Sequence, residues 1–451
     1  MKFVVVGTSH YGYEVTQTLL KDYPEAEIYL YERGNEASFL SCGIHSYLED
    51  TAPSLDSLHY ADEESYKEQG VHIHVNSDVV GVDPQAQTVT VKTADGEERQ
   101  EYDKLFLSPG ALPGTIDIPG LDLEHVYYMR GRDWADAVKD RMSTAKKAVV
   151  IGAGYIGVEA AEAYARQGID TTLIEYADQM LPAYLDSELT DLLQATAEEN
   201  GLKVRTGESA SEVVGENGQV VKVVTDQGEY EADTVILALG IQPNTDWLKD
   251  TLEVDDKGFV IIDEYTQTSA DHIFAGGDAT YIPYGPTDKE QSVALATSAR
   301  RQGIISAKNV EENKFKQPAV NGTSALPFFD YKLATTGLGE EACEQAGIDY
   351  ESQYVEEQIL PDFRGDDTTV HMKITYEKDS HKILGGQILS KSDETDSINV
   401  ISTAITAGWT LEDMAVADYY FQPSFDRPWH YLNVLAQKAL GETFGSDQMI
   451  F

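Results

Sequence analysis

The sequence predicts an α/β protein with two Rossmann-like dinucleotide-binding domains followed by a smaller α+β domain. Two observations support the first part: a short apolar strand, a glycine turn, a helix and a second strand ending in an acid occur at the N-terminus and again near residue 150. The third observation is a change after about residue 321, where strand-like patterns continue without any glycine nucleotide turn.

The first βαβ unit begins almost at the N-terminus. Its strand, helix and second strand are expected at residues 3–6, 13–20 and 27–31. Gly7 and Gly12 flank the turn, and Ser9 stands where the full motif has its middle glycine. Such a turn lets the backbone approach a pyrophosphate at the helix N-terminus, where free N–H groups favour anions. Glu32 closes the second strand and is placed to accept ribose hydroxyls.

The second unit carries a complete glycine motif in Gly152, Gly154 and Gly157. Its strand, helix and second strand are expected at residues 148–151, 158–166 and 171–174. Glu175 follows the second strand, and no arginine lies in the next several positions. A 2′-phosphate would meet this carboxylate, so the sequence predicts a preference for NADH over NADPH.

Later segments complete the expected architecture. Strands running into turns are expected at 102–110, 234–240 and 272–279, strands of the C-terminal part at 369–376 and 382–389, and helices at 397–407 and 428–440. Asp278 is placed to bond a flavin ribityl or pyrophosphate group. Two dinucleotide sites suggest that one holds a flavin and the other a nicotinamide. We expect an FAD-binding domain of residues 1–115 and 246–320, an NADH-binding domain of 116–245, and a C-terminal interface domain of 321–451.

Composition excludes several classes of partner. The chain of 451 residues has 78 acids against 33 bases and a formal charge of −45, which argues against nucleic acid and anionic membranes. No apolar run approaches the ~20 residues of a membrane helix, and the apolar start is too short for a signal peptide. Only two cysteines occur, Cys42 and Cys343, so no disulfide framework is expected. These features indicate a cytoplasmic protein.

Cys42 is the most informative residue of the N-terminal half. It lies about ten residues after the first βαβ unit, and no second cysteine follows within a turn or two. It therefore cannot form a local redox disulfide, and a single sulfur in this place could face a flavin ring. A helix starting after Gly43, together with a nearby cation, would lower the pKa of its thiol.

Taken together, these motifs resemble the FAD-dependent pyridine nucleotide-disulfide oxidoreductase family, in its branch with a single active cysteine. The likeness spans essentially the whole chain and rests on SFLSCG at 38–43, GAGYIG at 152–157, Asn244-Thr245, FAGGDA at 274–279 and FQPSFDRPW at 421–429. It implies a glutathione reductase-like fold. The sequence departs from the family pattern at Ala325, where a glycine is common, and at Ser9, which the family tolerates.

The resemblance also implies a set of cofactor contacts. For FAD these are Gly7, Ser9, His10, Gly12, Glu32, Arg33, Cys42, Val79, Ser108, Gly110, Arg132, Asp278 and Ala296. For NADH they are Gly152, Gly154, Tyr155, Ile156, Gly157, Glu159, Glu175, Tyr184 and Gly240. In this family Tyr155 would lie over the flavin and swing aside for nicotinamide, although its pattern is equally typical of core packing. No metal is predicted.

By the same resemblance, the catalytic residues are Cys42, His10, Glu14 and Arg300. His10 would lie beside the cysteine, Glu14 one helical turn on would orient it, and Arg300 would steady the pair. From the residues alone, His10 is also typical of a solvated turn and Arg300 of a surface. Cys343 is expected to be a partly buried helix residue without a redox role, because nearby acids would raise its thiol pKa.

The chemistry expected of one sulfur is a cycle between thiolate and sulfenic acid. The resemblance favours an NADH peroxidase that reduces hydrogen peroxide to water, because water-forming oxidases usually lack a glutamate at Glu14 and tend to carry Phe at Trp429. The alternative is a water-forming NADH oxidase acting on dioxygen. Reduction of coenzyme A disulfide would need a basic groove, and a passive redox sensor would not need an NADH site. The 421–429 segment would reach the active site of a second subunit, which implies a homodimer or homotetramer.

Overall fold

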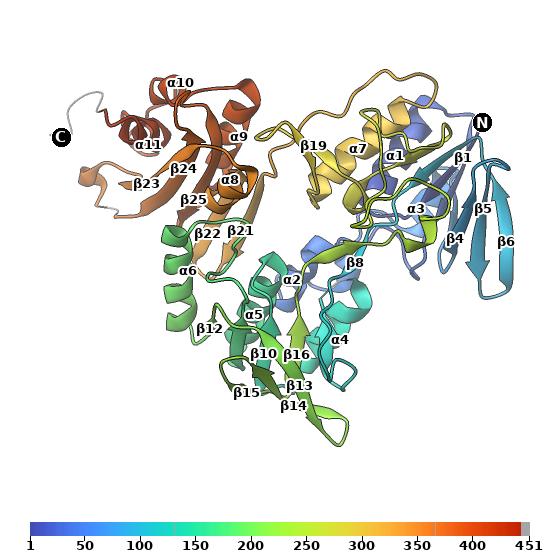
Figure 1. Cartoon of the computed structure of the whole chain (residues 1–451), viewed down its shortest axis with the longest axis horizontal. Helices are drawn as coiled ribbons and strands as arrows, with labels where there is room; N and C mark the ends of the chain where they lie inside the picture. The colour runs from blue at the N-terminus through green and yellow to red at the C-terminus, as the bar shows by residue number, and fades with distance from the viewer. Residues whose placement is uncertain (130, 366, 443–451) are drawn as a thin grey trace.

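The structure is a computed structural model that describes residues 1–129, 131–365 and 367–442. Three five-stranded sheets form its framework. In Figure 1 the N-terminal sheet lies at the right, the second sheet at the bottom and the C-terminal sheet at the upper left. The mixed α/β architecture predicted from the sequence is confirmed.

The first sheet is wholly parallel, with the strand order β18-β7-β1-β2-β3. Its strands are β1 (Lys2–Val6), β2 (Glu27–Tyr31), β3 (His72–His74), β7 (Lys104–Leu107) and β18 (Ile273–Ala275). The central strand β1 is covered on both faces, which explains its continuous apolar run. Because the strands are parallel, the loops that follow them all open at one edge of the sheet.

Different layers cover the two faces of this sheet. Phe3 and Val5 pack towards helices α1 (His10–Asp22) and α7 (Ala296–Lys308), which also contact each other. Val4 and Leu105 face the other way, into a second apolar cluster that includes strand residues of an antiparallel meander. This meander consists of β4 (Asp78–Asp83), β5 (Thr88–Thr93) and β6 (Gly96–Glu101). Alternate residues of β1 therefore serve two cores.

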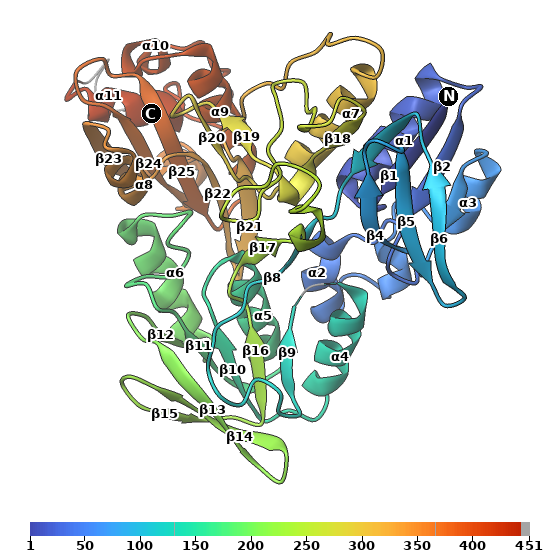
Figure 2. The ribbon, with the colours of Figure 1, turned by 45° about the vertical axis from the view of Figure 1, so that its right-hand side comes forward.

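The second sheet repeats the first, with the parallel order β12-β11-β10-β16-β9. Its strands are β9 (Val126–Tyr128), β10 (Lys147–Ile151), β11 (Asp170–Ile174), β12 (Lys203–Arg205) and β16 (Thr234–Leu237). The helices of this part are α4 (Arg132–Met142), α5 (Tyr155–Arg166) and α6 (Ser187–Glu199), and its meander is β13 (Ala210–Glu216), β14 (Gln219–Thr225) and β15 (Glu229–Glu231). Figure 2 shows this meander below the second sheet.

The third sheet is antiparallel, with the order β21-β22-β25-β24-β23. Its strands are β21 (Ser324–Phe328), β22 (Tyr331–Gly337), β23 (Tyr350–Gln358), β24 (Thr369–Glu377) and β25 (Ile383–Ser390). Helices α9 (Ile398–Ala407), α10 (Leu411–Ala415) and α11 (Tyr431–Ala439) share one apolar cluster with the sheet. The α+β character expected after residue 321 is therefore present.

Shorter elements connect these parts. They are α2 (Ile44–Leu48), α3 (Glu63–Glu68), α8 (Glu340–Ala346), β8 (Ala111–Pro113), β17 (Ile241–Pro243), β19 (Ile282–Tyr284) and β20 (Lys289–Gln291). β8 and β17 pair antiparallel, so the two chain segments between the first and second sheets run side by side.

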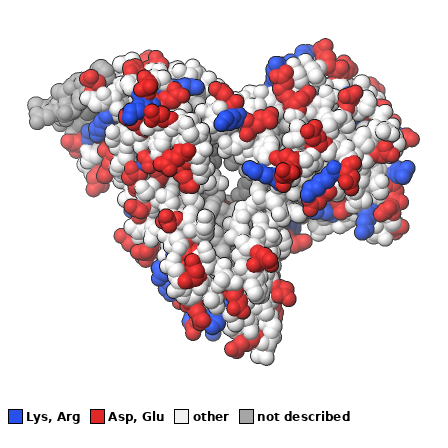
Figure 3. Space-filling view, viewed as in Figure 1, with Lys and Arg blue, Asp and Glu red and all other residues white. Residues whose placement is uncertain are grey.

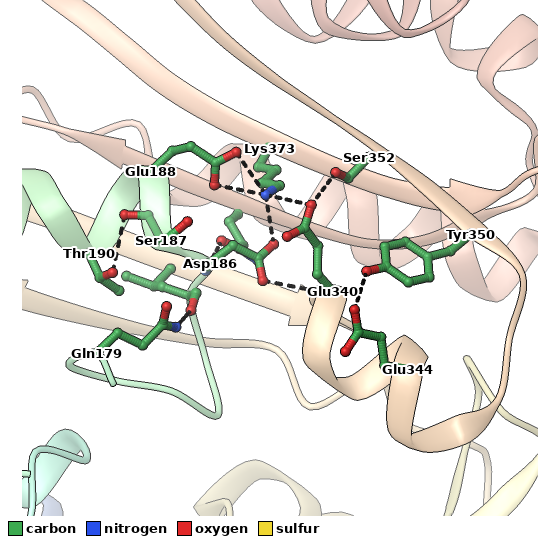
Figure 4. Close-up of polar contacts among 12 residues, drawn as sticks. Gln179, Asp186, Ser187, Glu188, Thr190, Glu340, Glu344, Tyr350, Ser352 and Lys373 are labelled. Carbon is green, nitrogen blue, oxygen red and sulfur yellow. Dashed lines mark hydrogen bonds and ion pairs between the residues drawn. The ribbon is translucent and has the colours of Figure 1, made fainter. Parts of the chain in front are cut away.

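A buried lysine joins the second and third parts (Figure 4). Lys373 on β24 is 1% exposed, and its Nζ lies 2.8 Å from Glu188 on α6 and 2.8 Å from Glu340 on α8. Asp186, which caps α6, lies 3.5 Å from the same nitrogen and accepts a 2.8 Å hydrogen bond from Gln387. A buried charge with several partners is costly to disrupt, so these contacts fix how α6 meets the third sheet.

Both nucleotide-turn helices begin earlier than predicted. α1 starts at His10 instead of residue 13, and α5 starts at Tyr155 instead of residue 158. The apolar pattern begins only after Gly12 and Gly157, so the predicted helix starts are too late. The first helical turn has N–H groups without intrahelical partners, and it accommodates these glycines. His10 therefore belongs to the first helical turn and not to the glycine loop.

Candidate functional site

The loops at the carboxyl edge of the first sheet bring together residues that are far apart in the sequence. Gly7 follows β1, Glu32 follows β2, Ser108 follows β7 and Asp278 follows β18. The backbone N–H of Gly7 donates to Tyr31, so the glycine turn is tied to the end of β2. This edge is where parallel α/β sheets bind ligands.

The first glycine turn is too tight for other residues. Gly7 has φ of +90°, and a Cβ there would lie 2.4 Å from the carbonyl oxygen of Ser108. A Cβ on Gly12 would lie 1.8 Å from the carbonyl oxygen of Gly7. Helix α1 starts after Ser9 without a side-chain cap and without an acid in its first turn. Its first N–H groups are therefore suited to an anion such as a pyrophosphate.

Glu32 lies against this turn. Its carboxylate accepts hydrogen bonds from the backbone N–H and hydroxyl of Thr8, at 3.1 and 2.8 Å, and from the N–H of Gly34 at 2.9 Å. These bonds hold the carboxylate at the rim of the glycine turn, where an adenosine ribose would lie in a bound dinucleotide.

The second glycine turn resembles the first in the close approach of its first glycine to a carbonyl oxygen, but there is open space around its middle glycine. A Cβ on Gly152 would lie 2.4 Å from the Ala238 carbonyl oxygen, whereas a Cβ on Gly154 would meet nothing within 4 Å. Helix α5 begins after Gly154, again with no side-chain cap and no acid in its first turn. Glu175 accepts from the N–H of Ala153 at 2.6 Å and is held at the rim. The two turns therefore each fit a dinucleotide.

Two tyrosines predicted at the NADH site contact each other. The rings of Tyr155 and Tyr184 stack with centroids 3.8 Å apart, and the Tyr155 hydroxyl lies 2.8 Å from that of Ser324. Burial raises the pKa of both phenols. Ile156 lies in the first turn of α5, one turn before Glu159, and Gly240 follows β16 with φ of +76°.

The structure brings His10, Glu14 and Arg300 together, although 290 positions separate the first and last. The Arg300 Nε donates to Nδ1 of His10 at 3.3 Å, and its Nη1 lies 2.6 Å from Glu14 Oε1. This contact follows from the packing of α1 against α7. Burial lowers the pKa of His10, the Arg300 charge lowers it further, and Asp278 opposes both.

Tyr60 is a site residue that the sequence did not indicate. Its ring stacks on His10 with centroids 5.2 Å apart and an interplanar angle of 10°. The Arg300 guanidinium lies over the rings of Tyr60 and Tyr13, at 5.0 and 4.9 Å. Burial raises the pKa of Tyr60, and the Cys42 charge contributes in the same direction. No motif surrounds Tyr60, so only the fold reveals it.

Cys42 lies in a 3₁₀ turn formed by Ser41–Gly43, directly before α2, and is exposed. The preceding loop is anchored on the first glycine turn: Ser38 donates to the Thr8 carbonyl at 2.8 Å, and its N–H donates to the Thr8 hydroxyl at 2.9 Å. Ser38 has φ of +55°, a conformation that non-glycine residues seldom adopt. The loop is thus held over the same edge that carries His10.

The other predicted FAD contacts differ in character. Arg132 is paired with Glu36 and Asp56, both at 2.7 Å, and Arg33 is exposed. Val79 belongs to β4, is 5% exposed and packs in an apolar cluster, so its side chain is turned towards the core. Gly110 has φ of +65°, and Ala296 is the first residue of α7.

Cys343 is fully buried in α8, not partly buried as predicted. Tyr284 and Leu384, which are distant in the sequence, pack against Cys343. The local helical pattern on which the prediction rested contains no information about these contacts. Burial raises the pKa of its thiol to about 12, and nearby acids add to the shift. A thiol with this pKa is a poor nucleophile near neutral pH.

The 421–429 segment exposes aromatic side chains. Phe421 is 48%, Phe425 66% and Trp429 40% exposed in the single chain, and Tyr420 beside them is 68% exposed. Arg427 anchors this segment to the third sheet through a 2.6 Å hydrogen bond to Gln358. Exposed aromatic groups in one region are typical of an interaction surface.

Within the described ranges of the chain, no helix combines the length and apolar character needed to cross a membrane.

Comparisons with known proteins find relatives that cover nearly the whole chain. Residues 1–303 match the pyridine nucleotide-disulphide oxidoreductase family, and residues 323–431 match its dimerisation domain. An NADH oxidase from Enterococcus faecalis is 38% identical over 98% of this chain and 99% of its own. An NAD(P)H coenzyme A polysulfide/persulfide reductase from Pyrococcus horikoshii is 30% identical over 97% of this chain and 98% of its own. The structure of a water-forming NADH oxidase from Lactobacillus brevis, solved with NADH, is 36% identical and superposes with a TM-score of 0.95, covering 98% of each chain.

Proposed function

Because the chain belongs to the pyridine nucleotide-disulphide oxidoreductase family and is an NADH-dependent flavoprotein oxidoreductase, we propose that it reduces dioxygen to water. FAD and NADH are its cofactors. Dioxygen as acceptor is supported by the relatives named as NADH oxidases. The observation that carries the rest of the proposal is a single exposed thiol, Cys42, on a loop anchored to the FAD-type glycine turn.

The proposed chemistry needs one sulfur. FAD, when bound, accepts a hydride from NADH and passes electrons on to oxygen and sulfur. Two electrons and two protons reduce dioxygen to hydrogen peroxide. The Cys42 thiolate then attacks one peroxide oxygen, the O–O bond breaks, and the leaving hydroxide takes a proton to become water. Two further electrons and one proton convert the Cys42 sulfenic acid back to thiolate and release the second water.

His10 is proposed to stabilise the leaving oxygen through a hydrogen bond. Since Arg300 donates to its Nδ1, the neutral ring carries its proton on Nε2, which is then free to donate. Tyr60 stacks on the imidazole and, with Arg300, fixes its plane. The lowered pKa of His10 keeps its ring neutral near neutral pH, so Nε2 acts as a hydrogen-bond donor and the leaving hydroxide takes its proton from solvent.

No disulfide joins Cys42 and Cys343. The only other cysteine, Cys343, is fully buried in α8 beneath Tyr284 and Leu384. Oxygen, as sulfenic acid, is therefore proposed to take the place of a second sulfur.

A second candidate function is NADH peroxidase, with hydrogen peroxide supplied from outside. The ion pair between Glu14 and Arg300 favours it, because a glutamate at this position is the peroxidase-like feature of the sequence. The same Cys42 and His10 would act in both reactions.

Reduction of a coenzyme A disulfide or persulfide has less support, although one relative is named for it. The cofactor carries several phosphates, which bind basic grooves. On the face shown in Figure 3, acidic side chains are spread over all three parts and basic ones are scattered.

The deciding experiment measures NADH oxidation under two conditions: in air without peroxide, and under argon with added peroxide. Fast turnover in air, with two NADH consumed per dioxygen and no peroxide released, is expected for the oxidase. Fast turnover only under argon with peroxide would reject it in favour of the peroxidase.

We also propose that the protein forms a homo-oligomer. The match of residues 323–431 to a dimerisation domain and the exposed aromatic groups of the 421–429 segment support this. The domain boundaries after residues 115, 245 and 320, and the roles of the individual cofactor-binding residues, stay predictions.

A further inference from the structure

A cluster of one imidazole and two carboxylates lies where α2 packs against α5. His45 belongs to α2, which begins two residues after Cys42, and Glu49 follows it on the same helical face. Glu162 comes from α5. One potential ligand atom from each of these three side chains lies within 4.8 Å of the others. Among the residues that the structure describes, no other group of His, Cys, Asp and Glu meets this criterion.

Three atoms of this group, here called the His45 cluster (His45, Glu49 and Glu162), are buried without a hydrogen bond, and one of them, Oε1 of Glu49, instead forms an ion pair with Arg166. His45 is 7% exposed and Glu162 is 2% exposed. Nδ1 of His45 and Oε2 of Glu162 find no hydrogen-bond partner within the described part of the chain. Buried polar atoms almost always have partners, so an unpaired carboxylate oxygen at this depth calls for a bound species.

Arg166 holds the two carboxylates from one side. Its guanidinium lies 3.0 Å from Oε1 of Glu49 and 2.7 Å from Oε1 of Glu162. The N–H of Phe329, in the third part of the chain, also donates to Oε1 of Glu162 at 2.6 Å. The Oε2 atoms stay available: that of Glu49 lies 3.2 Å from Nε2 of His45, and that of Glu162 is unpaired.

We propose that the His45 cluster is a binding site for a divalent transition-metal cation of the Zn²⁺ type. One imidazole nitrogen and two carboxylate oxygens, with water in the open position, form a donor set that zinc accepts. Two ligand atoms of a tetrahedral zinc centre lie about 3.3 Å apart. The 3.2 Å between His45 Nε2 and Glu49 Oε2 already has this spacing. Arg166 and the Phe329 N–H would orient the carboxylates through their other oxygens.

The position of the site gives it a consequence. The cation would tie α2, which follows the Cys42 turn, to α5, which carries Tyr155, and to the Phe329 turn of the third part. A tie between these segments would resist any movement of the nicotinamide-side helix against the cysteine loop. Zn²⁺ is therefore expected to slow NADH oxidation, and a chelator to restore it.

The test measures metal binding on the flavin-loaded enzyme carrying Cys42→Ser, so that the exposed thiolate cannot bind zinc. The chelator-treated protein is titrated with Zn²⁺ by calorimetry and with Co²⁺ by visible absorption. One cation per chain is expected, with a Co²⁺ spectrum of low coordination number. His45→Gln and Glu49→Gln should each weaken binding at least about tenfold, since even residues that only support metal ligands contribute that much.

His381→Gln is the matched control. His381 lies 2.7 Å from Glu412, its side chain is 37% exposed, and it belongs to no three-residue group within the described ranges. It should bind Zn²⁺ like the parent. Glu49 is partly exposed at the end of α2, so its variant keeps the test valid if His45→Gln does not fold. Absence of a tight cation in the parent, or equal binding in the parent and in the folded variants, overturns the proposal.

Discussion

Nε of Arg300 lies 3.3 Å from Nδ1 of His10. An arginine N–H only donates, so Nδ1 of His10 is the acceptor and the neutral ring carries its proton on Nε2. The contact joins the first residue of α1 to the fifth residue of α7, and it explains how Arg300 sets the tautomer of His10.

Arg300→Met should raise the pKa of His10. Burial is the larger cause of the lowered pKa, and the Arg300 charge is the second, so removing that charge moves the pKa back towards 6.5. His10 would then become protonated at a higher pH. As the pH is lowered, the peroxide turnover of the variant should therefore begin to fall at a higher pH than that of the parent. NMR titration of the His10 ring and the pH profile of kcat/KM measure this. Arg301→Met, on the exposed side of α7, is the control, and equal midpoints in both variants would contradict the assignment.

Cys42→Ser should keep bound FAD and release hydrogen peroxide in place of water. The serine hydroxyl cannot form a sulfenic acid, so reduction of oxygen should stop after two electrons. One peroxide per NADH is expected, measured with a peroxide-specific assay beside the flavin absorbance. Cys343→Ser is the control and should still form water, because that thiol is buried and its pKa is raised to about 12. Complete water formation by Cys42→Ser would remove this sulfur from the mechanism.

Glu175→Ala should lower the preference for NADH over NADPH. A hydrogen bond to a charged group contributes about 1.5–3 kcal/mol, so the ratio of the two kcat/KM values should change about tenfold or more. Glu175 also accepts from the N–H groups of Ala153 and Ala177, so both activities should fall somewhat. Glu212→Ala, an exposed acid of β13, is the control. An unchanged ratio would show that Glu175 does not discriminate the cofactors.

Lys373→Met should destabilise the chain markedly. Removing one partner of a buried ion pair costs about 3–5 kcal/mol, because Asp186 is left 8% exposed without its cation. The melting temperature by calorimetry measures the effect. Lys391→Met is the matched control: its pair with Asp330 is more than half exposed on both sides, so a loss of only about 0–1 kcal/mol is expected. Similar melting temperatures in the two variants would contradict the structural role of Lys373.

Trp429→Glu should weaken the proposed homo-oligomer. A carboxylate in an aromatic interface loses hydration without gaining a partner, which opposes association. Light scattering after gel filtration should show a smaller particle than the parent. Phe315→Glu, an exposed aromatic residue before the third sheet, should leave the mass unchanged. A monomeric parent would refute the oligomer itself.

Local patterns were enough to predict the nucleotide-binding units. β2 matches its predicted bounds, and β1, β10 and β11 differ by one residue. A parallel strand covered on both faces is apolar throughout, and a glycine turn permits little variation, so each signal is contained in a few adjacent residues. The starts of α1 and α5 were placed too late, because capping by backbone alone leaves no signal in the sequence.

The candidate site was predicted less completely. His10, Glu14, Cys42 and Arg300 were named through a family resemblance, and only the packing of α1 against α7 shows that Arg300 meets the other two on α1. Tyr60 was missed, since it lies in a loop without a motif and contacts His10 across about 50 positions of sequence, beside the bridge between Phe39 and His59.

The sequence by itself therefore determined the two dinucleotide turns, the acids that follow them and the single cysteine after the first unit, because each depends on neighbours within about 30 residues. Tertiary structure decided the tautomer of His10, the depth of Cys343 and the meeting of His45 with Glu162. These depend on contacts between residues tens to hundreds of positions apart, and burial and charge at such contacts are properties of the packed chain that no local pattern encodes.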